Sequence, residues 1–361
     1  MSPKWQRNIR RIFPFGLIWL VTGMLFLFVE SVANRGVNPN PATDITVTPS
    51  VLIFAFIAIT ILGWIVGFFE MVILNNLFRR KTFLGKVFYK FLLYGSIMLT
   101  TMILAFPLAA SIETGLPMTD PTVLARLRNF LTSLTFASTL VQLAFSLLLS
   151  FIYSGLSEHV GHRHLFNLLS GRYHNPQEEE RIFMFLDLKG STTVAEELGH
   201  IPYFKFLREY YGDLSDSIIK YRGEVYQYIG DEIVITWPMN QGIKDSNCIR
   251  CFYSMKEALA KREDYYRKEF GVSPSFKAGL HGGSVTTGEI GALKKEIFYT
   301  GDVLNVAARI QGLCNQFGKD LLLSAWLSDL LDWKDLDIQP ISVGEVELKG
   351  KKEAMRILSI E

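Results

Sequence analysis

The stretch RIFMFLDLKGST, residues Arg181–Thr192, decides the fold of the second half of the chain. Its first eight residues are mostly apolar and contain an acid near the end. This pattern is typical of a short buried strand that carries a carboxylate at its edge. Gly190 then turns the chain, and a helix is expected over Thr192–Leu198. The stretch therefore places Asp187 at a strand end, directly before a glycine turn.

The residues that follow alternate between helix and strand patterns. Glu224–Ile229 and Glu232–Trp237 are β-rich and meet at Gly230-Asp231, which predicts a hairpin. The remaining strands are expected at Ser275–Leu280, Ser284–Ile290, Leu321–Ser324, near Ile338, Val343–Leu348 and Met355–Ile360. Helices are expected at Pro202–Tyr221, Asp245–Phe270 (capped by Asp245 or Ser246) and Val303–Phe317. This mixture predicts an α+β domain with a mostly antiparallel sheet and helices on one of its faces.

The first part of the chain has a different composition. Residues 1–158 hold only 12 of the 37 Lys and Arg residues and 6 of the 35 Asp and Glu residues. Four apolar runs, Ile12–Val29, Val51–Leu74, Val87–Ala110 and Phe130–Leu156, are long enough to cross a bilayer, which needs roughly 17–25 residues. We therefore expect an all-α membrane domain of four transmembrane helices over 1–156. A cytoplasmic helical linker over 157–180 and a soluble domain over 181–361 would follow it.

Basic residues set the predicted orientation of the spans. The N-terminus carries Lys4, Arg7, Arg10 and Arg11, and the loop Asn75–Lys86 carries four more basic residues. Such loops stay in the cytoplasm, so we expect a multi-pass protein of the inner or plasma membrane with both termini cytoplasmic. The lipid bilayer is then a partner, and the spans are interpreted as an anchor or a sensor. A transporter or channel would need more polar residues along the spans.

Few ionisable residues lie inside the predicted spans. Glu70 lies near the inner end of the second span and is expected to reach the headgroup region. His159, His162 and His164 are interpreted as solvated residues next to the membrane. Within the soluble domain, Cys248 and the cysteine three residues later form a CxxC without a second pair, which favours reduced, half-buried thiols over a zinc site. The sequence has no basic stripe, so no nucleic-acid partner is expected.

The chemistry of the soluble domain is predicted at its turns. Asp187 and Asp231 both lie at strand ends beside glycines, so a sheet edge can bring the two carboxylates together. Paired carboxylates with small neighbours suit Mg²⁺ or Mn²⁺, which prefer oxygen ligands and share them with phosphates. Farther along, Asn305 and Arg309 are four residues apart and share one helical face. An amide and a guanidinium on that face suit a sugar and a phosphate.

Five phrases together resemble the class III adenylate and guanylate cyclases, over roughly Glu178–Glu361. They are FLDLKGST (Phe185–Thr192), YIGDE (Tyr228–Glu232), GLHGGSVTTGEIG (Gly279–Gly291), TGDVLNVAARI (Thr300–Ile310) and VELKGK (Val346–Lys351). The resemblance implies a ferredoxin-like catalytic domain that converts a nucleoside triphosphate to a 3′,5′-cyclic nucleotide and pyrophosphate. It also implies a homodimer with two composite sites and two Mg²⁺ or Mn²⁺ ions per site.

The resemblance assigns expected roles to single residues. Asp187, Asp231 and the Leu188 carbonyl would bind the metals; Asn305 would orient the ribose, and Arg309 would stabilise charge on the α-phosphate. The expected substrate-binding residues are Gly190, Ser191 and Thr192 in the turn, Gln227 and Phe298 at the base, and Lys349 at the terminal phosphates. In the family the aspartates come from one chain and the Asn/Arg pair from the other.

The base is less clear than the reaction. Adenylate-specific relatives usually have Lys where Gln227 stands, and Asp or Thr where Phe298 stands; guanylate-specific ones have Glu and Cys. A shift of register would bring Tyr299 or Thr300 to the second place. We favour adenylate cyclase, with guanylate cyclase or a catalytically silent signalling module as alternatives. A diguanylate-cyclase type of transferase would need a GG-acid-acid-Phe signature at Asp231, and it leaves the Asn/Arg pair unexplained.

Overall fold

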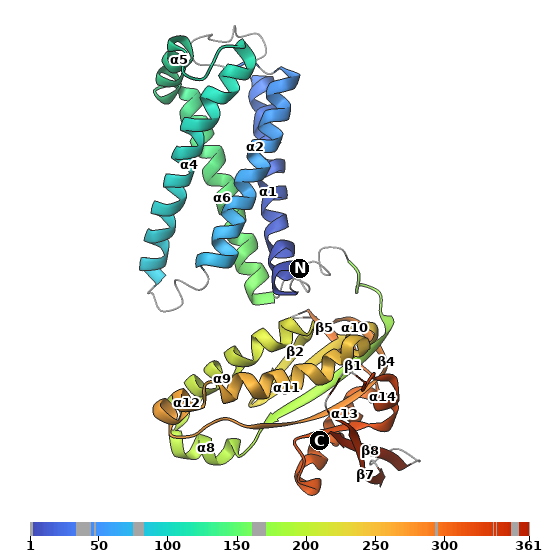
Figure 1. Ribbon diagram of the computed structural model, residues 1–361. Coiled ribbons are helices and arrows are strands. Elements are labelled where there is room, and N and C mark those ends of the chain that lie inside the picture. The colour runs from blue at the N-terminus through green and yellow to red at the C-terminus, as the bar shows by residue number, and fades with distance from the viewer. Residues whose placement is uncertain are drawn as a thin grey trace. The chain divides into compact units, whose positions relative to one another are not determined.

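The computed structural model describes residues 3–33, 45, 46, 48–74, 83–160, 171–292, 295–334, 336, 338–347 and 354–360. These residues belong to two compact units, one within 5–166 and the other within 167–361. Figure 1 shows the first unit as a bundle of helices and the second as a sheet with helices packed against it.

The first unit is built from long apolar helices. Their bounds are α1 Pro3–Ala33, α2 Pro49–Phe68, η1 Phe69–Leu74, α4 Phe83–Thr114, α5 Pro121–Leu131 and α6 Leu134–Val160, where η1 continues α2 as a π-helix. Among the described residues, four stretches are long and apolar enough to cross a membrane: Trp5–Val32, Pro49–Leu74, Phe88–Thr114 and Leu134–Glu158. The four predicted apolar segments are therefore confirmed as helices of suitable length and composition.

The fourth of these helices begins later than predicted, because a separate short helix precedes it. Asp120 caps this helix, α5, through Oδ1, which accepts a hydrogen bond from the Thr122 amide at 2.8 Å. A break follows α5, and the Ser133 hydroxyl accepts from the Phe136 amide at 3.1 Å, next to the start of α6. Phe130 thus belongs to α5 and not to the long helix.

The carboxylate of Glu70 is buried inside the helical unit, although the sequence predicted that it reaches the headgroup region. It lies in η1 and is 7% exposed. Lys90 of α4 forms an ion pair with it. The Tyr94 hydroxyl donates to Oε2 at 2.7 Å, and the Ser154 hydroxyl of α6 is 3.4 Å from Oε1. A buried carboxylate needs such partners. The Glu70 side chain is therefore directed into the helical unit, and the prediction that it reaches the headgroup region was wrong.

The linker predicted over 157–180 is described only in part. α6 continues to Val160, and β1 begins at Gln177. Residues 161–170, which include His162 and His164, lie outside the described residues, as does most of the basic loop at 75–82. Residues 157–160 are helical as part of α6, but residues 171–176 form turns and 177–180 belong to β1, so the prediction of a helical linker was wrong for 171–180. The orientation inferred from the basic loop stays a prediction.

The second unit contains an eight-stranded sheet. Its strands are β1 Gln177–Leu188, β2 Glu224–Ile229, β3 Glu232–Pro238, β4 Phe276–Ile290, β5 Glu296–Thr300, β6 Leu321–Ser324, β7 Pro340–Glu347 and β8 Ala354–Ile360. The strand order is β2-β3-β1-β4-β6-β8-β7, and β5 pairs with the outer part of β4. All pairs are antiparallel except β4 with β6. The predicted α+β class with a mostly antiparallel sheet is confirmed.

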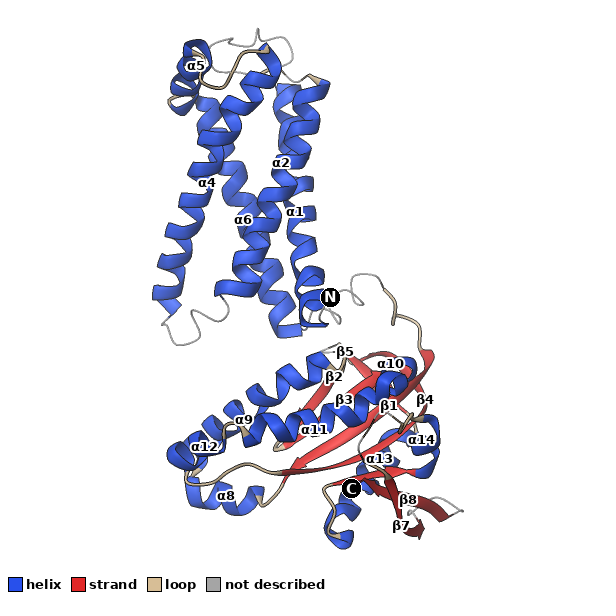
Figure 2. Cartoon of the chain, in the orientation of Figure 1, coloured by secondary structure: helices blue, strands red, loops and turns tan. Residues whose placement is uncertain are grey.

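Helices cover both faces of the sheet, whereas the sequence predicted helices on one face. They are α8 Ser191–Leu198, α9 His200–Lys220, α10 Met239–Ile243, α11 Asn247–Ala260, α12 Glu263–Phe270, α13 Asp302–Phe317 and α14 Ala325–Leu330. Met184 of β1 belongs to the core shared with α9 and α11, while its neighbour Phe183 packs with Val303 and Ala307 of α13. Figure 2 shows α9 and α11 lying along one face of the sheet. β1 is thus apolar on both faces, and its unbroken apolar run is the sequence signal of such a strand.

Several predicted elements have different limits in the structure. β4 runs unbroken through Gly282 and Gly283, where two strands were expected, because it pairs with β1 along its length. The predicted helix Asp245–Phe270 is two helices, since the chain leaves helical geometry at Arg262. That guanidinium contacts Asp213 of α9 at 2.5 Å. β5, α10 and α14 were not predicted, and Ile338 lies in no strand.

The start of α11 also differs from the predicted cap. Asp245 and Ser246 both have positive φ angles, 52° and 50°, and neither side chain caps the helix. The Ser246 hydroxyl instead donates to the Asp332 carbonyl at 2.6 Å. Inside α11, Cys248 and Cys251 are fully buried, and burial raises the pKa of the Cys248 thiol to about 12. The thiols are free, and they are more deeply buried than expected.

Candidate active site

Three carboxylates meet where β1 ends and the β2–β3 hairpin turns. Asp187 is the penultimate residue of β1 and pairs with Glu232 of β3, the residue directly after Asp231. Burial raises the pKa of the Asp187 carboxyl, and the nearby Asp231 carboxylate raises it further. Burial also raises the pKa of Glu232, with both aspartates acting in the same direction. The structure thus brings the two predicted aspartates together and adds a third acid that the sequence analysis missed.

A lysine partly offsets this negative charge. Lys277 lies opposite Asp187 on β4, and its Nζ is 3.3 Å from Asp187 Oδ2. Gln311 of α13 donates to the same oxygen at 3.2 Å. Neither residue was predicted, because the contacts depend on strand register and on the packing of α13 rather than on a local motif.

The cluster suits a divalent cation that shares its ligands with a substrate. Crowded carboxylates with a raised pKa favour the approach of positive charge. In the described part of the chain, no group of three or more His, Cys, Asp or Glu side chains could hold a metal by itself. Mg²⁺ usually takes one or two carboxylates and completes its shell with water and phosphate. Leu188 can add only its main-chain carbonyl, because its aliphatic side chain, which is buried in the core, has no atom that binds a metal.

Tyr211 of α9 supports the turn that carries Asp231. Its hydroxyl donates to the Gly230 carbonyl at 3.0 Å, and its ring lies 4.6 Å from that of Tyr228. Gly230 has a φ of 64°, a left-handed conformation that glycine adopts without strain. The sequence analysis missed Tyr211, although the adjacent tyrosines of α9 were a visible signal.

The predicted phosphate turn lies at the start of α8. Gly190 has a φ of 65° and precedes the helix without a side-chain cap. Ser191 and Thr192 form the first turn of α8, so their amide groups are among those that find no partner within the helix. Such a helix start attracts anions. The turn directly follows the β1 edge that carries Asp187, as the sequence predicted.

The predicted Asn/Arg pair lies on α13 and away from the sheet. Val306, Ala307 and Ile310 are buried, whereas Asn305 is exposed and Arg309 is partly exposed. No hydrogen bond or ion pair joins either residue to Asp187 or Asp231 in the described structure. One chain therefore does not assemble all the predicted catalytic groups in contact.

The predicted base positions lie on β2 and β5. Gln227 and Phe298 are both exposed, and Phe298 is 44% exposed. Tyr299 is only 3% exposed, and its ring packs 4.9 Å from that of Tyr226 of β2. The shifted register that would offer Tyr299 to the base is therefore disfavoured. Lys349 lies outside the described residues.

Comparison with protein families identifies the second unit. The family profile of the adenylate and guanylate cyclase catalytic domain matches residues 174–359, more than half of the chain. This chain belongs to the class III nucleotidyl cyclases. The cyclase is 37% identical over 194 residues to adenylate cyclase 2 of Rhizobium meliloti, a match that covers 54% of this chain and 53% of that protein. It is 28% identical over 183 residues to an adenylate cyclase of Anabaena cylindrica, covering 49% and 36%.

Solved structures show the same fold. A bacterial light-regulated adenylyl cyclase superimposes with a TM-score of 0.52 at 23% identity, covering 61% of this chain and 64% of that one. The predicted cyclase fold and the membership of the cyclase family are thus confirmed. The cyclase spans about half of adenylate cyclase 2 and about a third of the Anabaena protein.

Proposed function

We propose that this chain is a membrane-anchored adenylate cyclase that converts ATP to 3′,5′-cyclic AMP and pyrophosphate at a homodimer interface. The observation that carries the proposal is that Asp187 and Asp231 lie together at one edge of the sheet. Asn305 and Arg309 lie elsewhere, on the less buried face of α13. The first pair suits metal ions, and the second suits a ribose and a phosphate.

Each residue of the site then has a definite task. Two Mg²⁺ or Mn²⁺ ions held by Asp187, Asp231 and the Leu188 carbonyl would activate the 3′-hydroxyl and neutralise the leaving pyrophosphate. The amides of Ser191 and Thr192 hold phosphate oxygens at the α8 start. Lys277 supplies a cation at the same strand edge. Lys349 is proposed to bind the terminal phosphates.

The remaining groups come from the second protomer. Arg309 donates to the α-phosphate as charge develops there, and Asn305 fixes the ribose so that the 3′-oxygen faces phosphorus. Catalysis rests on positioning and on electrostatic stabilisation. Two observations support a dimer. In the described structure no hydrogen bond or ion pair joins Asn305 or Arg309 to the aspartates of their own chain, and Tyr228, Ile229 and Phe298 expose 44–50% of their surfaces. A group of exposed apolar side chains is typical of a surface that binds another protein.

Adenine is the proposed base. The Gln227 amide has both donor and acceptor atoms, so it can pair with an adenine edge. The exposed Phe298 ring offers a stacking surface. Guanine also satisfies Gln227, which keeps guanylate cyclase as the second candidate. The four apolar helices are proposed to anchor the enzyme in the inner or plasma membrane, with both termini in the cytoplasm.

Full-length protein in lipid nanodiscs is expected to form cyclic AMP when supplied with Mn²⁺ and ATP, and much less cyclic GMP from GTP. Mass spectrometry would quantify both products. Asp231→Ala is expected to be inactive, whereas Asp329→Ala, at an exposed aspartate of α14, should behave as the parent does. Cyclic GMP as the main product would move the assignment to guanylate cyclase. The absence of both products from a folded dimer would contradict the enzyme proposal and favour a silent signalling module.

A further inference from the structure

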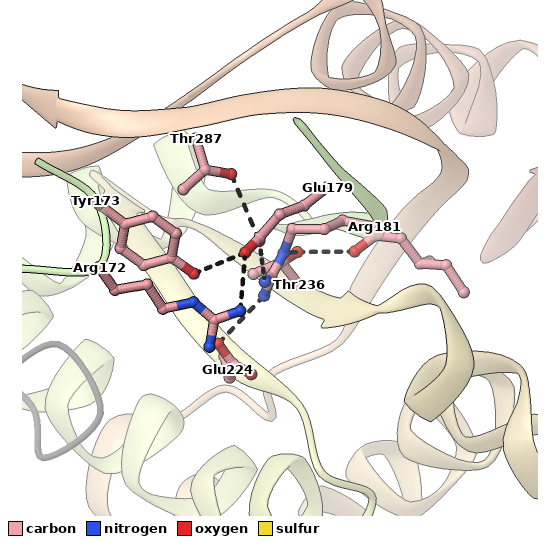
Figure 3. A network of polar contacts seen from close by, with 8 residues as sticks. Arg172, Tyr173, Glu179, Arg181, Glu224, Thr236 and Thr287 are labelled. Atoms are coloured by element: carbon pink, nitrogen blue, oxygen red, sulfur yellow. Dashed lines mark hydrogen bonds and ion pairs between the residues drawn. The ribbon is translucent and has the colours of Figure 1, made fainter. Parts of the chain in front are cut away.

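A buried arginine connects the strands that carry the base positions. Arg181 lies on β1, on the face that also bears Phe183 and Asp187, and it is 2% exposed. Figure 3 shows Arg181 among its polar partners. Its Nε donates to Thr236 Oγ1 of β3, and its Nη2 donates to Glu224 Oε2 of β2, both at 3.1 Å. The guanidinium therefore joins β1 to the two strands of the hairpin that carries Asp231.

The same guanidinium also reaches the strand that precedes α13. Its Cζ lies 4.8 Å from the centre of the Tyr299 ring on β5. Tyr299 is adjacent to Phe298, and Glu224 lies three residues before Gln227. A desolvated cation over an aromatic face is attractive. The guanidinium presents five donors in a rigid planar fork, whereas an ammonium presents three on a flexible stem. Arg181 thus contacts both strands that carry the base positions, although it lies far from these positions in the sequence.

The segment before β1 joins this network through Glu179. Arg181 Nη1 donates to Glu179 Oε2 at 3.1 Å, and Thr287 of β4 is 3.5 Å from the same oxygen. The Tyr173 hydroxyl donates to the other oxygen, Oε1, at 2.9 Å. Arg172 forms an ion pair with Oε1 at 3.6 Å. Glu179 therefore divides its carboxylate between the buried arginine and the linker.

Tyr173 is buried like a core residue and is hydrogen-bonded to the sheet. It is 4% exposed, and its carbonyl accepts a hydrogen bond from the Glu289 amide of β4 at 3.0 Å. Arg172 adds a second cation to the Glu179 carboxylate. The segment at 172–173 is therefore bonded both to β4 and to the carboxylate that binds Arg181.

We propose that Arg181 is a positioning residue that fixes β2 and β5 around the purine, and that Arg172 and Tyr173 of the linker act on these strands through Glu179. The proposal rests on the proposed cyclase function of the site. The linker then acts on the active site through Glu179, because a change in the contacts of Arg172 or Tyr173 with Glu179 alters the partners available to Arg181. The strands that respond are those that carry Gln227 and Phe298.

The chain offers a matched control for this arrangement. Arg262 likewise pairs with two carboxylates, Glu209 and Asp213, and lies 4.1 Å from the Tyr265 ring. Its partners belong to α9 and α12, and none of them is on β2 or β5. Replacing it removes similar interactions from a place that the proposal does not involve.

The test compares Arg181→Lys, Tyr173→Phe and Arg262→Met in the full-length chain in nanodiscs by hydrogen–deuterium exchange and by kinetics. Arg181→Lys is expected to speed exchange in residues 224–231 and 296–301. It should also raise the KM for ATP about tenfold with little change in kcat, and weaken discrimination between ATP and GTP. Tyr173→Phe should produce smaller changes in the same two segments. Arg262→Met should speed exchange in α9 and α12 and leave KM unchanged.

Parental exchange rates in both segments of a folded Arg181→Lys protein would overturn the positioning role. Changes in Tyr173→Phe that are confined to its own segment would overturn the role of the linker. The exchange measurement needs no turnover. If the parent makes no cyclic nucleotide, the proposed function fails, while the exchange rates still decide whether Arg181 and Tyr173 hold β2 and β5.

Discussion

Arg309→Ala is expected to lower kcat by about 10²–10³-fold, because it removes a donor that acts on charge developing in the transition state. KM for ATP should change little, since the ground-state triphosphate is held elsewhere. Arg309 lies on the partly exposed face of α13, so its truncation leaves no cavity in the core. Purified full-length protein with Mn²⁺ and saturating ATP would give kcat directly.

Arg208, an exposed arginine on α9, provides the comparison for this variant. Arg208→Ala removes the same charge from the surface and should keep parental kcat. If Arg309→Ala stayed within about tenfold of the parent, Arg309 would not be the group that stabilises the transition state. An increase in KM with unchanged kcat would instead assign it to ground-state binding.

Gly279→Ala is expected to cost at least about 3 kcal/mol in the free energy of unfolding and to abolish activity, because β4 and α13 touch there. A Cβ at this position would lie 2.2 Å from the Gln311 nitrogen and 2.7 Å from the Ala307 carbonyl oxygen. Both are backbone atoms, so the helix has to move as a whole. That movement would displace Asn305 and Arg309. Denaturant unfolding combined with the cyclase assay measures both effects.

Gly312→Ala is the matched substitution on α13 itself. A Cβ there meets no atom within 4 Å, and alanine is favoured over glycine in a helix interior, so stability should rise by about 0.5–1 kcal/mol. Equal stability of the two alanine variants would contradict the close packing of α13 on β4. Loss of activity in Gly312→Ala would also contradict it.

Local patterns were enough to predict much of the fold. β2 and β6 have the limits that the sequence indicated, because each is a short β-rich run between clear turn signals. Two features that depend on distant partners were missed: the strand β5, and the face of the sheet that the predicted helix α13 covers. β5 exists through its pairing with β4, and α13 covers the second face of the sheet because Phe183 and Val303 pack together. The split between α11 and α12 depends on an ion pair between Arg262 and α9, which no local rule contains.

The residues of the site likewise divide into those with a local sequence signal and those without one. Asp187 and Asp231 could be predicted because each occupies a strand end beside glycine, and the structure brings them together. Lys277 and Gln311 enter the site through strand register and helix packing, so no local motif predicts them. The ion pair between Glu70 and a lysine twenty residues later was missed for the same reason. The roles of Leu188, Gln227, Phe298 and Lys349 stay predictions.

The most direct test of the shared active site mixes two inactive variants of the chain. Asp231→Ala lacks a metal ligand, Arg309→Ala lacks the transition-state donor, and a dimer of the two would contain one intact composite site. With random pairing in co-expressed protein, half of the dimers are mixed and each has one of two sites, so about a quarter of parental activity should return. A chain that carries both substitutions, mixed with itself, should stay inactive. A mixture as inactive as its components, although shown to contain mixed dimers, would contradict the shared site.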